Sequence, residues 1–267
     1  MIGGNALTVD VSIANPSLVP AIVERVAGMF DVDADPVAIA ECLSRDRLLN
    51  AACARHAGIR LPGAWDPFEL AVRAILGQQI SVRGATTIAG RVAARWGESV
   101  IAAHGVDRLF PFPAALADAP LEEAGIIAAR AKTIRALAQR VVSGQLVFAS
   151  PAVMDTLLDI PGIGPWTAQY IAMRAMQQAD AFPSGDLVLR RMAGNLSAGA
   201  LNAHSERWRP WRSYAVMLLW QAANDHPASS RRKTDAKVDR ARRPRAARSS
   251  GSGGVARRAA GRKGTRR

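Results

Sequence analysis

Asp186 and a glycine-containing turn upstream of it are the residues of this chain whose types and spacing could do chemistry together. The turn, Pro161–Pro165, joins two apolar stretches of helical spacing and is too short to be anything but a tight connection between helices. Its central amides, on Gly162, Ile163 and Gly164, can point outward and bind an anion, because glycine lets a ligand approach the backbone closely. Asp186 follows a Phe-Pro-Ser-Gly loop and supplies a carboxylate, which can orient or deprotonate a water molecule.

Each of these features also has a plainer interpretation. The turn by itself is compatible with an interhelical connection that holds no ligand, and Asp186 with a residue that only caps the helix it begins. Asp180 is a second carboxylate nearby, but it precedes the loop, and we expect it on a solvated turn. The interpretation therefore depends on what else the chain carries.

The net charge of +13 is confined to the end of the chain. Residues 227–267 hold 15 of the 35 Lys and Arg and 2 of the 22 Asp and Glu, so residues 1–226 hold 20 of each. This tail lacks apolar periodicity, and we expect it to be disordered. It would bind DNA or another polyanion non-specifically and with a steep salt dependence; a solvated tail without a specific partner is the alternative.

The remaining composition disfavours metal enzymes and membrane proteins. Cys42 and Cys53 are too few for a disulfide framework or a four-cysteine cluster, and the four histidines lack metal-ligand spacing. There is no signal peptide and no uninterrupted apolar run long enough to span a bilayer. A chain of 267 residues that is 49% hydrophobic can bury a sizeable core, so we expect a globular protein of a reducing compartment.

Most of the chain is predicted to be helical. A helix capped by Ser17 is expected to run to about Phe30, and Asp-Pro pairs at Asp35 and Asp66 begin two more, because Asp is a good N-cap and Pro fits the first helical position. Ser81 begins the next helix. Further helices are expected at 114–124, 129–143, 150–159, 165–177, 186–194 and 210–224. Short connections between them indicate a compact bundle.

One strand is predicted near the N-terminus, where residues 6–14 alternate and are rich in β-branched types. A single strand cannot satisfy its own ladder hydrogen bonds, so it needs partners that this chain barely supplies.

Three separated motifs resemble the AlkA type of 3-methyladenine DNA glycosylase, of the helix-hairpin-helix superfamily. The turn at Pro161–Pro165 together with Asp186 resembles the hairpin and the catalytic Asp of that family. Residues 66–78 resemble its first core helix, and residues 207–215 resemble the start of its closing helix. The resemblance covers about residues 5–225 and implies an all-α fold of two helical subdomains. It assigns residues 1–30 to a short β remnant and helix of an N-terminal α/β domain, 31–226 to the helical core and 227–267 to the tail.

The resemblance implies a monofunctional glycosylase, which hydrolyses the N-glycosidic bond of alkylated purines in double-stranded DNA during base excision repair. The damaged base must leave the helix for its bond to be reached. Asp186 would stabilise the positive charge that develops on the sugar and activate the attacking water. The hairpin would hold the DNA backbone through Gly162, Ile163, Gly164 and Thr167.

Trp166, Tyr170, Trp220 and Leu187 match positions of the family's base pocket. Alkylation at a ring nitrogen leaves a purine cationic, and aromatic faces bind cations at about 0.5–2 kcal/mol each; core packing is the alternative for each aromatic. Trp166 fills the position of the nucleophilic lysine in glycosylases that also cut the strand, and residues 133–232 contain no Lys, so a lyase step is disfavoured. The family often has an aromatic residue where this chain has Leu187, which puts base selectivity in question.

Two further features follow from the resemblance. Gln79 and Ile80 match the wedge that fills the gap left by the extruded base; the Gln79 amide would hydrogen-bond the orphaned base and Ile80 would supply apolar contact, with an ordinary turn as the alternative. The family's hairpin also holds a structural monovalent cation through backbone carbonyls. The matching carbonyls here belong to Leu158, Ile160 and Ile163.

Two other functions compete with this one. A non-catalytic helix-hairpin-helix DNA-binding protein would gain nothing from Asp186 near DNA phosphates, and a bifunctional glycosylase for oxidised bases is opposed by Trp166 and the missing lysine. We therefore expect a monomer that binds alkylated double-stranded DNA and requires no cofactor. It would work in a bacterial cytoplasm, associated with the nucleoid.

Overall fold

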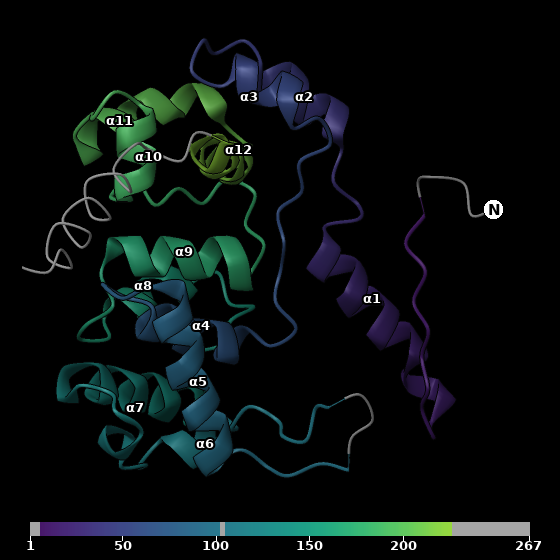
Figure 1. The fold of residues 1–267 in the computed structure, drawn as a ribbon, viewed down its shortest axis with the longest axis vertical. Helices are drawn as coiled ribbons and strands as arrows, with labels where there is room; N and C mark the ends of the chain where they lie inside the picture. The colour runs from purple at the N-terminus through teal and green to yellow at the C-terminus, as the bar shows by residue number, and fades with distance from the viewer. Residues whose placement is uncertain (1–5, 102–104, 226–267) are drawn as a thin grey trace, which may run out of the picture. The chain divides into compact units, whose positions relative to one another are not determined.

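The computed structural model describes residues 6–101 and 105–225, and the predicted disordered tail lies outside them. The described chain is mostly helical, as expected (Figure 1). In chain order the helices are η1 (Pro16–Leu18), α1 (Val19–Phe30), α2 (Pro36–Leu43), α3 (Asn50–Arg55), α4 (Pro67–Leu76), α5 (Val82–Trp96), α6 (Pro113–Leu116), η2 (Leu121–Ala124), α7 (Ala128–Val142), α8 (Val153–Leu158), α9 (Pro165–Ala175), α10 (Leu187–Met192), α11 (Ala198–Ser205), η3 (Glu206–Trp208) and α12 (Arg212–Asp225).

Side-chain caps account for several helix starts. The carboxylates of Asp35 and Asp66 and the hydroxyl of Ser81 accept hydrogen bonds from first-turn amides of α2, α4 and α5, which confirms these three predictions. The prediction that Ser17 caps a helix is wrong, because Asn15 caps the short η1 and accepts from the Ser17 amide at 3.1 Å. Helix α1 then begins at Val19.

Residues 6–14 form no strand, so that prediction is also wrong. The pairing seen in the described part of the chain is an isolated antiparallel bridge between Ser99 and Arg108. Without a neighbouring strand the alternating segment has no ladder to join, and Leu7 and Val9 remain exposed.

The expected helix at 114–124 is broken into α6 and η2, because Pro120 interrupts it. Helices α3 and α11 were not predicted; both are short, and neither carries a Pro at its first positions. In the described ranges no helix is long and apolar enough to cross a membrane.

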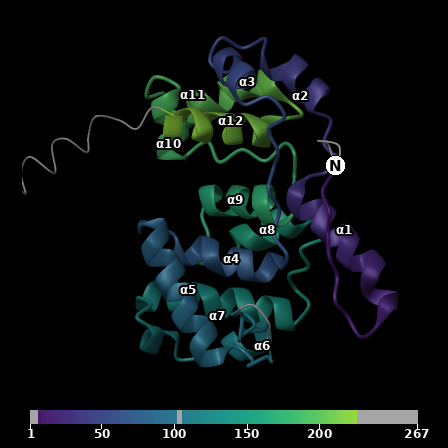
Figure 2. The same cartoon turned by 45° about the vertical axis from the view of Figure 1, so that its right-hand side comes forward.

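Two apolar clusters form the core and correspond to the two expected helical subdomains. The first joins α4, α5, α7 and α8 and includes Val72, Ile75 and Leu137. The second joins α2, α3, α10, α11 and α12 and includes Leu43 and Trp208. Helix α9 contributes buried residues to both clusters and lies between the two groups of helices (Figures 1 and 2). Helix α9, whose N-terminus carries the hairpin, is therefore held by both halves of the core.

Candidate active site

Asp186 caps α10 and is also part of a polar cluster. Its Oδ1 accepts hydrogen bonds from the amides of Val188 and Leu189 at 2.8 and 3.0 Å. Its Oδ2 accepts from Trp166 Nε1 at 3.1 Å, and Trp220 Nε1 lies 3.4 Å from Oδ1. Because the cap uses mainly one carboxylate oxygen, capping and a chemical role are compatible. These donors hold the carboxylate in one orientation.

The Asp186 carboxylate borders a pocket of about 610 Å³. The pocket brings together the carboxylate, the hairpin and the turn expected to act as a wedge. It is lined by Gly77, Gln78, Gln79, Gly164, Trp166, Thr167, Gly185, Asp186, Leu187 and Val188. Leu187 is 74% exposed at its edge, so a ligand in this pocket would touch an aliphatic side chain at that point.

Three predicted aromatic residues form a row beside Asp186. The rings of Trp166 and Tyr170 stack with centroids 5.3 Å apart and an angle of 15° between their planes. Trp220 is tilted against Tyr170 at 6.3 Å and 46°. Trp220 and Tyr170 also pack against the second core cluster, so core packing and site formation are combined in these two side chains.

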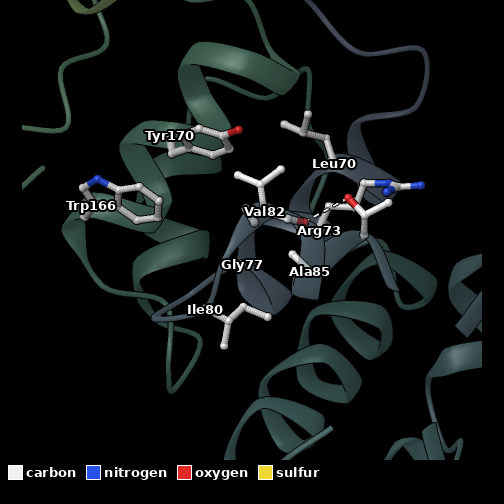
Figure 3. Close-up of a pocket in the computed structure, with 10 residues that line it drawn as sticks. Leu70, Arg73, Gly77, Ile80, Val82, Ala85, Trp166 and Tyr170 are labelled. Carbon is white, nitrogen blue, oxygen red and sulfur yellow. Dashed lines mark hydrogen bonds between the residues drawn. The ribbon is translucent and has the colours of Figure 1, made fainter. Parts of the chain in front are cut away.

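A second pocket of about 350 Å³ adjoins the first and shares Gly77 and Trp166 with it. Figure 3 shows Trp166 and Tyr170 on one side and residues of α4 and α5 on the other. Arg73 lines it and is paired with Glu69 at 2.6 Å. Sequence reasoning did not assign Arg73 to a site, because the helical pattern of α4 does not show which polar side chain faces a cavity.

Gly162 is required at its position in the hairpin. Its φ of 96° lies in the left-handed region. A Cβ there would lie 2.1 Å from the hydroxyl oxygen of Thr133, which donates to the Pro161 carbonyl at 2.8 Å. The turn is thus packed directly against α7.

The outward-pointing amides of the hairpin are fewer than expected. In the described structure the amides of Gly162 and Gly164 donate no hydrogen bond, but that of Ile163 donates to the Ile160 carbonyl at 3.0 Å and is not free for a phosphate. Thr167 is buried, and its hydroxyl oxygen accepts from Gln78 Nε2 at 3.0 Å. The Thr167 hydroxyl is therefore engaged within the protein, although Thr167 also lines the Asp186 pocket.

Gln78 belongs to the turn between α4 and α5 that carries the expected wedge (residues 77–80, the wedge turn) and joins it to the hairpin. Besides Thr167, its Nε2 donates to the Gly162 carbonyl at 3.1 Å, and its own carbonyl accepts from Arg130. The next residue, Gln79, is exposed with a φ of 57°, so the turn presents this side chain outward. Ile80 is half-buried and lines the second pocket. Sequence reasoning missed the role of Gln78, because its partners lie far away in the chain.

The three carbonyls expected to hold a cation lie at the end of α8 and in the hairpin. Among described hydrogen bonds, the Leu158 and Ile163 carbonyls accept none, whereas that of Ile160 accepts from the Ile163 amide. Carbonyl oxygens are suitable ligands for hard cations, so this donor set fits the group. The described residues contain no cluster of three or more His, Cys, Asp or Glu that could hold a metal ion.

Asp180 lies on a turn, as expected, but its half-buried carboxylate is held by two arginines instead of only by solvent. Its carboxylate accepts two hydrogen bonds from Arg212, at 2.8 and 2.9 Å, and is also paired with Arg209. Arg212 is buried, so the pair ties the loop before Asp186 to the start of α12. Because its carboxylate is paired with these arginines, Asp180 has a structural role and does not compete with Asp186 as the candidate catalytic carboxylate.

Comparison with protein families gives two matches. Residues 3–66 match the AlkA N-terminal domain, which extends past the expected boundary at residue 30, and residues 72–208 match the HhH-GPD superfamily base excision DNA repair protein. The probable bifunctional transcriptional activator/DNA repair enzyme AlkA of Mycobacterium tuberculosis is 41% identical over 77% of this chain, but the chain spans only 43% of that protein. The DNA-3-methyladenine glycosylase 2 of Escherichia coli is 33% identical, with 85% of this chain and 80% of that protein covered.

Solved structures support the same fold. A 3-methyladenine DNA-glycosylase from Archaeoglobus fulgidus superposes with a TM-score of 0.69 at 22% identity, covering 79% of this chain and 77% of that one. The Clostridium acetobutylicum 8-oxoguanine glycosylase/lyase in complex with double-stranded DNA also gives 0.69, at 21% identity, covering 80% and 77%. At these identities the likeness establishes the architecture alone.

Proposed function

The chain belongs to the HhH-GPD superfamily of base excision DNA repair proteins, in its AlkA-type branch, and we propose that it is a monofunctional DNA glycosylase that releases alkylated purines from double-stranded DNA. The single observation that carries this proposal is the position of Asp186. Its carboxylate borders a pocket whose other walls are the hairpin and the wedge turn.

In this proposal the damaged nucleotide leaves the duplex and its sugar enters the pocket beside Asp186. Cleavage of the N-glycosidic bond develops positive charge on the sugar, which a fixed carboxylate stabilises without reorganising. The Val188 and Leu189 amides and the Trp166 indole fix the carboxylate. Asp186 then orients or deprotonates the water that attacks the sugar.

The aromatic row would receive the base. A purine alkylated at a ring nitrogen is cationic, and the face of a stacked indole or phenol attracts such a cation by about 0.5–2 kcal/mol. Trp166 and Tyr170 line the adjoining pocket and are the side chains best placed for this contact.

Hydrolysis without strand cleavage is supported by the chemistry around Asp186. A lyase step requires an amine that attacks the sugar and forms a Schiff base. None of the residues that line the Asp186 pocket carries an amine. By the resemblance, Trp166 stands where glycosylases that also cut the strand have their nucleophilic lysine.

The hairpin would hold the DNA backbone with the Gly162 and Gly164 amides. The carbonyls of Leu158 and Ile163 would hold a monovalent cation, which would supply positive charge beside a DNA phosphate. The basic segment 227–267 would add non-specific, salt-dependent affinity. We place this activity in the cytoplasm at the nucleoid, where the proposed substrate lies.

The test uses the full chain and duplex DNA methylated at purines. Released base is measured by chromatography, and strand breaks are counted before and after alkali. Base release with breaks only after alkali supports the proposal. Breaks without alkali would indicate a lyase, and no release under any condition would indicate a non-catalytic DNA-binding protein.

A further inference from the structure

A third pocket, of about 340 Å³, lies against the wedge turn and the hairpin. Its lining residues come from the wedge turn, α7 with its N-terminal flank, and the hairpin: Gln78, Gln79, Ile127, Ala129, Arg130, Lys132, Thr133, Pro161 and Gly162. Gln78 and Gln79 also line the Asp186 pocket. The wedge turn is therefore a wall common to both pockets. The Asp186 carboxylate borders the pocket of about 610 Å³ and does not line the third pocket.

The charge of this third pocket is positive. Two of its lining residues, Arg130 and Lys132, are cationic, and none is acidic. Arg130 is half-buried and anchored, because its guanidinium donates to the Gln78 carbonyl. Lys132 is exposed, and among the residues that the structure describes it is the only lysine. The Thr133 hydroxyl already donates to the Pro161 carbonyl, so the groups of the pocket left for an anion are the Lys132 ammonium, the Gln79 amide and the Gly162 N–H.

We infer that this pocket binds a backbone phosphate of DNA next to the base step that the Gln79 wedge enters, with Lys132 as the ionic contact. The inference rests on the proposed function in one respect, namely that the ligand is DNA. It adds a second backbone contact to that of the hairpin, whose Gly162 lines the same pocket.

The chemistry favours a phosphate over an unpaired base as the occupant. Lysine is a compact point charge with rotatable donors, which suits a phosphate. Recognition of an unpaired base usually includes stacking on an aromatic face, and no aromatic residue lines this pocket. Arg130 would connect the bound phosphate to the Gln78 carbonyl, so binding the strand also fixes the wedge turn.

The first experiment measures the affinity of the full chain for a duplex with a stable abasic-site analogue, over a range of salt concentrations. Lys132→Gln should lower the slope of log affinity against log salt by about 0.9, the value for one lost phosphate contact. Arg45→Gln removes an exposed cation from the segment between α2 and α3 and should leave the slope unchanged. Equal slopes for Lys132→Gln and the unmodified protein would overturn the inference.

A second experiment identifies the occupant. Neutral methylphosphonate linkages are placed one at a time around the abasic site, and each duplex is tested with both proteins. One linkage should weaken binding of the unmodified protein while having little further effect on Lys132→Gln. If the effect of Lys132→Gln depends instead on the base opposite the abasic site, the pocket reads a base and the inference is wrong.

These readouts need no turnover, so they are separate from the test of function. A protein that binds abasic DNA through Lys132 but releases no base would refute the glycosylase proposal and leave the phosphate site standing. If the protein releases base but Lys132→Gln leaves the salt slope unchanged, the phosphate site is refuted and the glycosylase proposal stands. Failure to bind the abasic-site duplex at all would overturn the phosphate site, while the base-release assay alone would decide the glycosylase proposal.

Discussion

Trp166 donates its indole N–H to Asp186 Oδ2 at 3.1 Å, so one aromatic side chain both lines the pocket and orients the carboxylate. The same ring stacks on Tyr170. The orientation of the Asp186 carboxylate and the shape of the aromatic wall therefore both depend on the position of Trp166.

Trp166→Phe should separate these two roles, because phenylalanine keeps an aromatic face and lacks the donor. A hydrogen bond to a charged group contributes about 1.5–3 kcal/mol, so we expect single-turnover base release to slow by roughly 10- to 100-fold. Trp65→Phe, at an exposed position, serves as the control and should not change the rate. An unchanged rate for Trp166→Phe would show that the bond does not position the carboxylate.

Gly162→Ala should destabilise the hairpin. The new Cβ would meet the Thr133 hydroxyl, and the left-handed backbone alone costs about 1–3 kcal/mol for a non-glycine residue. We expect a lower urea midpoint and weaker DNA binding. Gly164→Ala is the matched control, because a Cβ there meets nothing within 4 Å, and it should keep the urea midpoint. Similar midpoints for both variants would contradict the requirement for glycine at 162.

Local signals in the sequence predicted much of this arrangement. The caps at Asp35 and Ser81 depend on neighbouring residues only, and the structure has them as expected. The contact of Gln78 with Thr167 and the pairing of Asp180 with Arg212 join distant segments, and no local pattern encodes such partners. The strand at 6–14 failed for the same reason, since strand formation depends on a neighbour that local periodicity does not reveal.

Gln79→Gly tests the wedge role of this side chain without destabilising the fold. Gln79 has a φ of 57°, which glycine adopts freely, so the free energy of unfolding should change by less than about 1 kcal/mol. Removal of the side chain should slow excision from a matched pair. It should slow excision less when the damaged base is mismatched, because a mismatched base leaves the stack more easily. Equal effects on both substrates would argue that the turn has no role in eversion.

Asp46 should contribute to stability in a pH-dependent way. Burial alone would raise the pKa of its carboxyl, but hydrogen bonds from the Leu48 amide, the Trp208 indole and His204 outweigh it, and the pKa lies below its ordinary value of 3.8. Its stabilisation is therefore present above pH 3.8 and is lost as the pH falls from there through the folded-state pKa.

Asp46→Asn should remove that part of the acid dependence. The free energy of unfolding of the unmodified protein should fall more steeply below about pH 4 than that of the variant. Urea denaturation at a series of pH values measures both curves, with Asp33→Asn at an exposed site as control. Parallel curves for the unmodified protein and Asp46→Asn would refute the contribution.

The most direct measurement is single-turnover base release by Asp186→Asn on methylated duplex DNA. Asparagine is also a good N-cap and its side-chain oxygen can accept from the Val188 and Leu189 amides, so α10 should persist. Loss of the negative charge should reduce release by about 100-fold or more, while affinity for abasic-site DNA is retained. Release at the unmodified rate by a folded, DNA-binding Asp186→Asn protein would contradict the catalytic role of this carboxylate.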